Sequence, residues 1–218
     1  MTITIKVPAA SNRLTTVQRV SDELSLPDGS APDDELLASF IDEASAFIER
    51  YTGFRFPQET VVEKLGSDGG HRLILSRRPI KSITSIKYKG ALVDSSLYEI
   101  EDAMAGFVWR NDSKWKNTIE VAGGIVNKLY GPPSQDYEVE YVAGYIVPED
   151  TSATRDLPFD IERACIELCK LYYYRQKADP MVRRERIGDS FVWYQDSGDR
   201  SLPPHIKAIL DRWKNLAV

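Results

Sequence analysis

Cysteine and histidine are scarce in this chain of 218 residues, which has only two of each. Cys165 and Cys169 are four positions apart in a segment of strong helical character, and residues one helical turn apart are poorly placed for a disulfide. We therefore expect two reduced thiols in the core. His71 and His205 lie far from both cysteines in the sequence, so we predict no metal site. Apolar runs are also short, which predicts neither a membrane span nor a signal peptide.

Motifs that carry catalysis or hold a cofactor are missing as well. The sequence has no GxxxxGK[ST] phosphate loop, and Gly123-Gly124 is not followed by the other glycines of a dinucleotide site. It also lacks HExxH and GxSxG. His71 lies beside a predicted turn and His205 in the first turn of a predicted helix, so we interpret both as surface residues. We predict a protein that is not an enzyme and binds no cofactor.

Basic residues are in the minority, with 28 against 33 acidic residues and a formal net charge of −5. This balance argues against a dedicated binder of duplex nucleic acid. The charge is unevenly distributed, because residues 1–154 carry a net −7 and residues 155–218 a net +2. Hydrophobic residues make up 42% and charged residues 28%, which is typical of a globular protein.

Two amphipathic patterns near the N-terminus predict helices. The first begins after Thr15 or Thr16, which can cap it, and ends near Leu24. The second follows Pro32, has acidic residues in its first turn and stops at Gly53. Its apolar side recurs at three- and four-residue spacings: Leu36, Leu37, Phe40, Ile41, Ala44, Phe47, Ile48 and Tyr51. The opposite side carries Asp42, Glu43, Glu49 and Arg50.

Between residues 57 and 150 the hydrophobic period changes to two. This pattern predicts short strands over residues 60–65, 72–75, 80–88, 97–101, 106–110, 118–121 and 137–142, with turns between them. No crossover helix separates the strands, so we expect an antiparallel sandwich or a partly closed barrel.

Helical periodicity returns near residue 157 and runs to about residue 177. Its predicted apolar face contains Ile161, Ala164, Cys165, Leu168, Leu171 and Tyr172. Residues 181–200 are expected to be irregular, and a last helix from Pro203 or Pro204 to Leu216 is expected to bury Ile206, Ile209, Leu210 and Trp213. We therefore predict an α+β fold. A small helical bundle formed by residues 12–56 and 151–218 would be interrupted by the β-rich insertion at 57–150.

Pairs of carboxylates on the predicted strands offer the one enzymatic alternative. Glu138 and Glu140, like Glu99 and Glu101, are spaced about 6.8 Å along a strand, a distance compatible with glycosidases. Alternating strands produce such pairs automatically, so we interpret these residues as a solvated face. The tryptophans Trp109, Trp115, Trp193 and Trp213 add the possibility of a stacking surface. A carbohydrate-binding or hydrolytic β-sandwich therefore stays as a less favoured alternative.

The segment 181–200 contains the most informative surface residues. Phe191, Trp193 and Tyr194 form an aromatic cluster outside any core pattern, which is typical of a protein interface. Arg183, Arg184 and Arg186 precede it. We predict that this segment contacts the acidic side of the second helix (Asp42, Glu43 and Glu49) in a neighbouring copy. Such a contact is head-to-tail and closes into rings.

Several segments, taken in order, resemble bacteriophage head–tail connector (adaptor) proteins of long-tailed phages. They span most of residues 14–194, and their order and spacing carry the resemblance. The segments are Leu36–Ala44 continuing through Ile48–Gly53, Leu75–Ile80, Tyr137–Tyr145, Leu157-Pro158 before Ile161–Leu168, and Glu185–Ser190.

The resemblance implies a structural protein of the virion, made in the bacterial cytoplasm, without catalysis and without a membrane. Connectors of this kind form a ring, usually of twelve copies, beneath the portal protein. They join the portal to the next neck or tail component and line a channel that DNA crosses without specific binding. The family has a small helical bundle, and its larger members carry a β insertion. Its C-terminal part typically engages the portal, which here corresponds to residues 181–200 and the helix ending at Val218.

Two further functions remain as alternatives at this level. Another neck protein, a stopper or a tail-completion factor, has a similar ring role. A nucleic-acid-binding module is less favoured because of the net negative charge.

Overall fold

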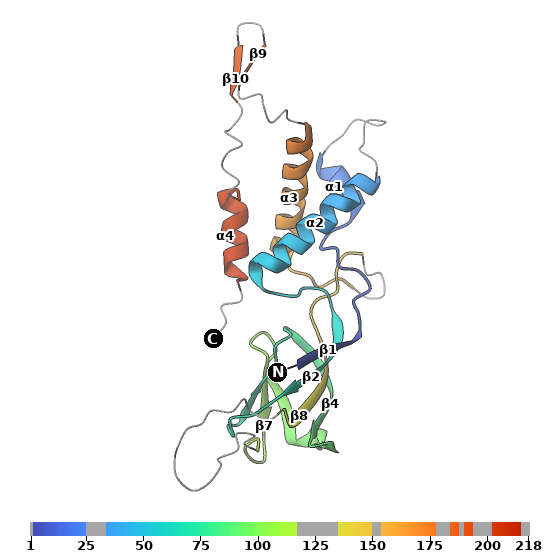
Figure 1. Cartoon of the computed structure of the whole chain (residues 1–218), viewed down its shortest axis with the longest axis vertical. Helices are drawn as coiled ribbons and strands as arrows, with labels where there is room; N and C mark the ends of the chain where they lie inside the picture. The colour runs from blue at the N-terminus through green and yellow to red at the C-terminus, as the bar shows by residue number, and fades with distance from the viewer. Residues whose placement is uncertain are drawn as a thin grey trace. The chain divides into compact units, whose positions relative to one another are not determined.

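The computed structural model describes residues 2–24, 34–116, 135–149, 154–177, 184–187, 190–193 and 202–214 (Figure 1). The chain divides into two compact units. The β unit consists of residues 1–11 and 55–146, and the helical unit consists of residues 12–54 and 147–218. Helices and antiparallel sheets occur together, so the predicted α+β fold is confirmed.

The helical unit contains four helices among the residues described: α1 (Val17–Leu24), α2 (Asp34–Thr52), α3 (Phe159–Lys177) and α4 (Pro204–Arg212). Thr16 caps α1, because its hydroxyl accepts a hydrogen bond from the Arg19 amide at 3.3 Å. Gly53 ends α2 with a positive φ of 68° while its N–H donates to the Glu49 carbonyl at 2.9 Å. Both helix ends lie where the sequence predicts them.

Helix α3 is the centre of the helical unit, since α1, α2 and α4 all pack against it (Figure 1). The predicted apolar side of α2 packs against α3, and the side chains at this contact are buried. The buried side chains of the two helices include Leu37, Ile41, Ala44, Ile48, Ile161, Ala164, Cys165, Leu168 and Cys169. None of the described helices is long and apolar enough to cross a membrane.

Details of the last two helices differ from the prediction. Helix α4 ends at Arg212, before Trp213, and Leu216 lies outside the described residues. The shorter helix buries Ile206 and Leu210 but leaves Ile209 and Trp213 half-buried. In α3 the buried tyrosine is Tyr173 and not Tyr172, which is half-buried and contacts the Phe40 ring. The apolar stripe of α3 therefore drifts by one position near its C-terminal end.

Two antiparallel sheets are found among the described residues of the β unit. The larger sheet has the order β1-β2-β8-β4-β5, formed by Thr2–Val7, Glu59–Leu65, Tyr137–Ala143, Ile80–Tyr88 and Ala91–Leu92. The smaller sheet has the order β3-β7-β6, formed by Arg72–Ile74, Phe107–Arg110 and Tyr98–Asp102. A 3-10 turn, η1 (Ser95–Leu97), precedes β6.

One apolar core joins these two sheets. Alternate residues of β8 point into it, which is why Tyr137, Val139 and Tyr141 are fully buried. Both sheets contribute to this core: Val61, Leu65, Leu73, Leu75, Ile80, Ile86, Val108, Trp115, Tyr137, Val139, Tyr141 and Ala143. The β region is thus sandwich-like, with antiparallel ladders as predicted.

Two strands of the larger sheet were not predicted from the sequence. Strand β1 pairs with β2 from Thr2 to Val7, although we assigned residues 1–11 to no domain. The alternation in Thr2-Ile3-Thr4-Ile5 carries the signal for this strand. Strand β5 has only two residues, too few for a periodic pattern. The strand predicted over residues 118–121 lies outside the described residues.

A glycine directly after β8 lets the backbone pass close to Pro57. Gly144 has a φ of +102°, and a Cβ atom there would lie 2.4 Å from the Pro57 carbonyl oxygen. A side chain has no room at this position, and the backbone conformation also disfavours one.

Candidate assembly surfaces

The acidic side of α2 was predicted to contact a neighbouring copy, and its carboxylates have different surroundings. Arg13 holds Asp42 through two hydrogen bonds, from Nε to Oδ1 at 2.7 Å and from Nη2 to Oδ2 at 3.0 Å. Arg13 also lies 3.4 Å from Glu149. The hydrogen bond to Asp42 raises the pKa of the Arg13 guanidinium. The charge of Asp42 is therefore already balanced inside the helical unit.

Glu43 lies next to Asp42 on α2 and is exposed. Among the described residues it forms no ion pair, and the same holds for Asp34 and Glu35 in the first turn of the helix. Glu49 is half-buried nearer the C-terminal end. Among Asp42, Glu43 and Glu49, which were predicted at an interface, Glu43 is exposed and has no ion-pair partner in the described part of the chain.

The prediction that residues 181–200 are irregular is wrong for part of this segment. The segment contains an antiparallel hairpin of β9 (Arg184–Ile187) and β10 (Ser190–Trp193). Gly188-Asp189 between two strand-forming runs is a known hairpin signal. The prediction missed it because the charged run Arg183–Arg186 was interpreted as a loop. Arg183 and Tyr194 lie outside the described residues.

The register of this hairpin places the other four predicted residues on one face. Arg186 pairs with Phe191, and Arg184 pairs with Trp193. Residues directly opposite each other in an antiparallel pair share a face, and so do alternate residues of a strand. The opposite face has Glu185, Ile187, Ser190 and Val192. The register therefore assigns these predicted cationic and aromatic residues to the same face of the hairpin.

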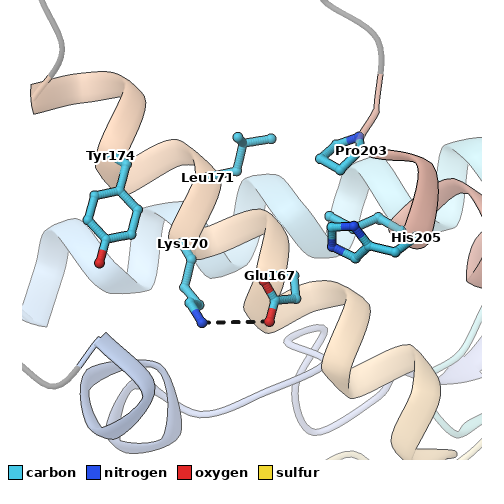
Figure 2. A pocket seen from close by; sticks show the side chains of 7 residues that line it. Glu167, Lys170, Leu171, Tyr174, Pro203 and His205 are labelled. Atoms are coloured by element: carbon cyan, nitrogen blue, oxygen red, sulfur yellow. Dashed lines mark ion pairs between the residues drawn. The ribbon is translucent and has the colours of Figure 1, made fainter. Parts of the chain in front are cut away.

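A shallow groove lies between α3 and α4 (Figure 2). Its volume is about 220 Å³, below the range of roughly 300–1,000 Å³ of small-molecule sites. An ion pair between Glu167 and Lys170, 3.6 Å apart, lies on α3 at its border. The remaining lining residues are Leu171, Tyr174, Pro203, His205 and Ile206. Nothing in this lining combines a nucleophile with a base that contacts it.

The carboxylates considered for hydrolysis are engaged in ion pairs on the sheet surface. Glu138 contacts Lys87 at 3.0 Å and Lys64 at 3.6 Å, and Glu140 contacts Lys6 at 2.6 Å. The hydrogen bond from Lys87 lowers the pKa of Glu138. A glycosidase acid needs a raised pKa, so this pair is suited to a solvated face.

The second pair of carboxylates has the same character. Glu101 accepts two hydrogen bonds from Arg72, at 2.5 and 2.6 Å, which lower the pKa of its carboxyl. Glu99 is exposed and forms no ion pair with a described residue.

The tryptophans do not form one stacking surface. Trp115 is buried in the core of the β unit, at 1% exposure. Trp109 is half-buried and stacks on His71, with the ring centroids 4.7 Å apart. His71 is thereby half-buried, whereas the prediction placed it on the surface; His205 is exposed as predicted. In the helical unit, the Trp213 indole donates to Asp160 at 2.8 Å. The side chain of Trp193 is not described.

The two cysteines are free and buried, as their helical spacing predicts. The Ser45 hydroxyl lies 3.7 Å from the Cys165 sulfur. A hydrogen bond with Cys165 and burial raise the pKa of the Cys169 thiol, which keeps it protonated and unreactive. In the ranges that the structure describes, no cluster of three or more histidine, cysteine or acidic residues is placed to hold a metal ion.

A buried carboxylate in each unit escaped the sequence analysis. Glu63 in β2 is fully buried and accepts hydrogen bonds from the Tyr141 hydroxyl at 2.5 Å, the Ser76 hydroxyl at 2.7 Å and the Ser76 amide at 3.1 Å. Burial and this carboxylate raise the pKa of Tyr141. The signal was present, since Glu63 shares its strand face with Val61 and Leu65.

Glu162 has the corresponding position in the helical unit. It is 1% exposed, forms ion pairs with Arg155 and with Arg19 at 3.2 Å, and accepts from the Thr15 hydroxyl at 3.4 Å. These partners come from α1, the residue before its cap and the segment before α3. Glu162 therefore fixes α1 to the start of α3.

Comparison with known proteins identifies the family. A family model described as "Head completion protein" matches residues 13–216, which is nearly the whole chain. The chain belongs to the head completion protein family. This membership confirms the resemblance to phage head–tail connector proteins and the prediction of a structural protein of the phage neck.

Solved structures agree with the family. The chain is similar to a protein in the neck of an empty gene transfer agent particle computed with C6 symmetry, with a TM-score of 0.61 and 19% identity. It is also similar to a protein in the neck of the native particle computed with C12 symmetry, with a TM-score of 0.58 and 17% identity. Each match covers 100% of this chain and 97% of the other. At these identities the likeness establishes a common fold. No curated protein matches the chain.

Proposed function

We propose that this head completion protein is a virion subunit that forms a ring in the phage neck, beneath the portal protein. The ring joins the portal to the next neck or tail component and lines the passage for DNA. The observation that carries the proposal is the family match over residues 13–216. The fold match over the entire chain to a neck protein of a particle computed with C12 symmetry supports a ring of about twelve copies.

The charge of the chain suits this role. A net charge of −5 disfavours tight binding of DNA phosphates, so DNA can slide through a ring of such subunits. The protein acts by contact and not by catalysis. The ion pairs that hold Glu138 and Glu140 support this part of the proposal.

Contacts between neighbouring copies are proposed between the hairpin face and α2. The hairpin contributes Arg184, Arg186, Phe191 and Trp193, together with the adjoining Arg183 and Tyr194. Helix α2 of the neighbour contributes its acidic side, Asp42, Glu43 and Glu49. Because Arg13 already balances Asp42, Glu43 is the main carboxylate for the incoming arginines. Complementary charges of this kind set register and partner choice.

The experiment is ring assembly with purified portal protein, followed by electron microscopy and native mass spectrometry. We expect rings bound to portal for the unmodified chain. Reversing Arg183, Arg184 and Arg186 to glutamate lowers the ring fraction, and Glu43→Lys does the same. Glu99→Lys is the matched control, since Glu99 is also exposed and forms no ion pair with a described residue.

Each part of the proposal has its own contrary result. Unchanged assembly after the arginine reversals contradicts the charge contact. Capture of a tail-tube protein in preference to portal supports a stopper or tail-completion factor instead. Absence of any ring, with portal or without, contradicts the proposed function as a whole.

A further inference from the structure

Strands β9 and β10 form a sheet of their own. They pair with each other over four residues each, and among the described strands neither pairs with any other. Every second residue of an antiparallel strand directs its N–H and C=O groups away from the partner strand. The hairpin therefore presents two edges that can accept another strand, one on β9 and one on β10.

Such a hairpin has little stability alone. An isolated two-stranded sheet is marginally stable in water, and an open edge favours pairing with another chain. Closure into a barrel removes all edges at once. A ring of identical copies offers this closure, because the β9 edge of each copy can meet the β10 edge of the next.

Charge disfavours a two-fold pairing through β9. If β9 paired with β9 of another copy about a two-fold axis, residues of the same face would be opposite each other. Each register that pairs three residues of β9 in both copies sets an arginine of one copy, Arg184 or Arg186, against an arginine of the other, which is destabilising. Strand β10 has no charged residue, so its pairing with β9 places Arg184 and Arg186 beside Phe191 and Trp193 instead.

We propose that, in the ring, the hairpins of neighbouring copies join edge to edge, β9 to β10, into one closed antiparallel sheet. The proposal rests on the ring of the proposed function and specifies how its subunits are joined. It uses the edges of the hairpin, whereas the contact with α2 uses its face.

The dimensions are compatible with a passage for DNA. About twelve hairpins supply about 24 strands, and a spacing of about 4.8 Å gives a circumference near 115 Å and a diameter near 37 Å. Strand tilt enlarges this diameter further. Barrels of about 16–18 strands already enclose an aqueous channel, so a closed sheet of this size leaves an open lumen.

Disulfide cross-linking between variants that each carry one added cysteine tests the pairing. Glu185→Cys is on β9 and Val192→Cys is on β10, on the same face. The two variants are mixed in equal amounts, assembled with portal and oxidised, and covalent dimers are measured on non-reducing gels. We expect dimers in the mixture, since about a quarter of the junctions bring the two cysteines together. The dimer band should exceed that of either variant alone by at least about tenfold.

One mixture serves as a negative control, and another tests a second register. Glu185→Cys mixed with Phe191→Cys places the cysteines on opposite faces, where no disulfide can form. Glu185→Cys mixed with Ser190→Cys covers the neighbouring same-face register. Cys165 and Cys169 are buried, so the unmodified chain gives the background.

The possible results separate this inference from the proposed function. Rings that form normally but yield no dimer in either same-face mixture overturn the edge pairing and leave the ring intact. Dimers of Glu185→Cys alone or of Val192→Cys alone indicate two-fold pairing and overturn it as well. Failure of the unmodified chain to form rings contradicts the proposed function itself.

Discussion

Replacing Glu63 with leucine would remove the acceptor of three hydrogen bonds in the β unit, one from the buried Tyr141 and two from the half-buried Ser76. The Tyr141 hydroxyl, the Ser76 hydroxyl and the Ser76 amide all donate to this carboxylate. The hydroxyls can rotate, but the amide cannot. A buried donor without a partner costs about 1–3 kcal/mol and a lost partly exposed hydrogen bond about 0.5–1.5 kcal/mol, so Glu63→Leu should lower the free energy of unfolding by about 2–6 kcal/mol.

Glu63→Gln is the matched comparison. The glutamine carbonyl can accept from Tyr141 and from the Ser76 amide, while its NH₂ donates to the Ser76 hydroxyl. All three partners remain satisfied, and one buried charge is lost. We expect a cost of about 0–2 kcal/mol, clearly below that of leucine. Glu138→Leu, which removes a partly exposed carboxylate from the same sheet, should cost less than about 1 kcal/mol.

Urea unfolding followed by tryptophan fluorescence and by far-UV circular dichroism measures these differences. Trp115 lies in the same core as Tyr141, so its fluorescence reports on the β unit. If the two units unfold separately, only the transition of the β unit should shift. Equal costs for Glu63→Leu and Glu63→Gln would refute the role assigned to the three hydrogen bonds.

Three further predictions concern other parts of the fold. Gly144→Ala should destabilise the β unit by more than about 3 kcal/mol, because the new Cβ would collide with the Pro57 carbonyl. Gly90→Ala is the control, since residue 90 has a φ of +83° but open space around it, and should cost about 1 kcal/mol. Similar shifts of the melting temperature for the two variants would contradict the close approach of residue 144 to Pro57. Glu162→Gln should cost about 1–3 kcal/mol in urea unfolding, because it removes the buried charge that pairs with the partly exposed Arg155 and Arg19; a loss of less than about 0.5 kcal/mol would show that the ion pairs contribute little. Lys87→Met should raise the pKa of Glu138, which NMR of its carboxyl carbon can measure, and an unchanged titration would exclude the Lys87 contact. Because the contact lowers the pKa of Glu138 in the folded state, the ion pair stabilises the fold at pH values above the normal carboxyl pKa. This stabilisation is lost as the pH falls through the lowered pKa.

The helices and the central strands were predictable because local patterns determine them. The cap at Thr16, the stop at Gly53 and the strand from Ile80 to Tyr88 each follow from short-range chemistry. Strand β1 was missed although the alternation of Thr2-Ile3-Thr4-Ile5 is clear, because the N-terminal segment was considered only as a candidate signal peptide. Its pairing with β2, unlike the alternation itself, leaves no mark on either segment alone.

The candidate surfaces were predictable in composition but not in arrangement. The sequence identifies Arg184, Arg186, Phe191 and Trp193 as unusual, yet only the strand register places them on one face. The ion pair of Asp42 with Arg13 was beyond prediction for a related reason. It joins α2 to a segment before α1 that has no periodic pattern of its own.

Both units are formed by segments far apart in the sequence, so the order of synthesis on the ribosome affects when each unit can fold. Strand β1 precedes the other strands of its sheet in the chain, but that sheet is complete only when β8 ends at Ala143. The apolar stripe of α2 is finished at Thr52, whereas α3, which covers it, begins at Phe159. At about 5–20 residues per second, that stripe remains uncovered for roughly 5–20 s. The β unit can therefore close before the helical unit, and the nascent chain most needs protection from aggregation along α2.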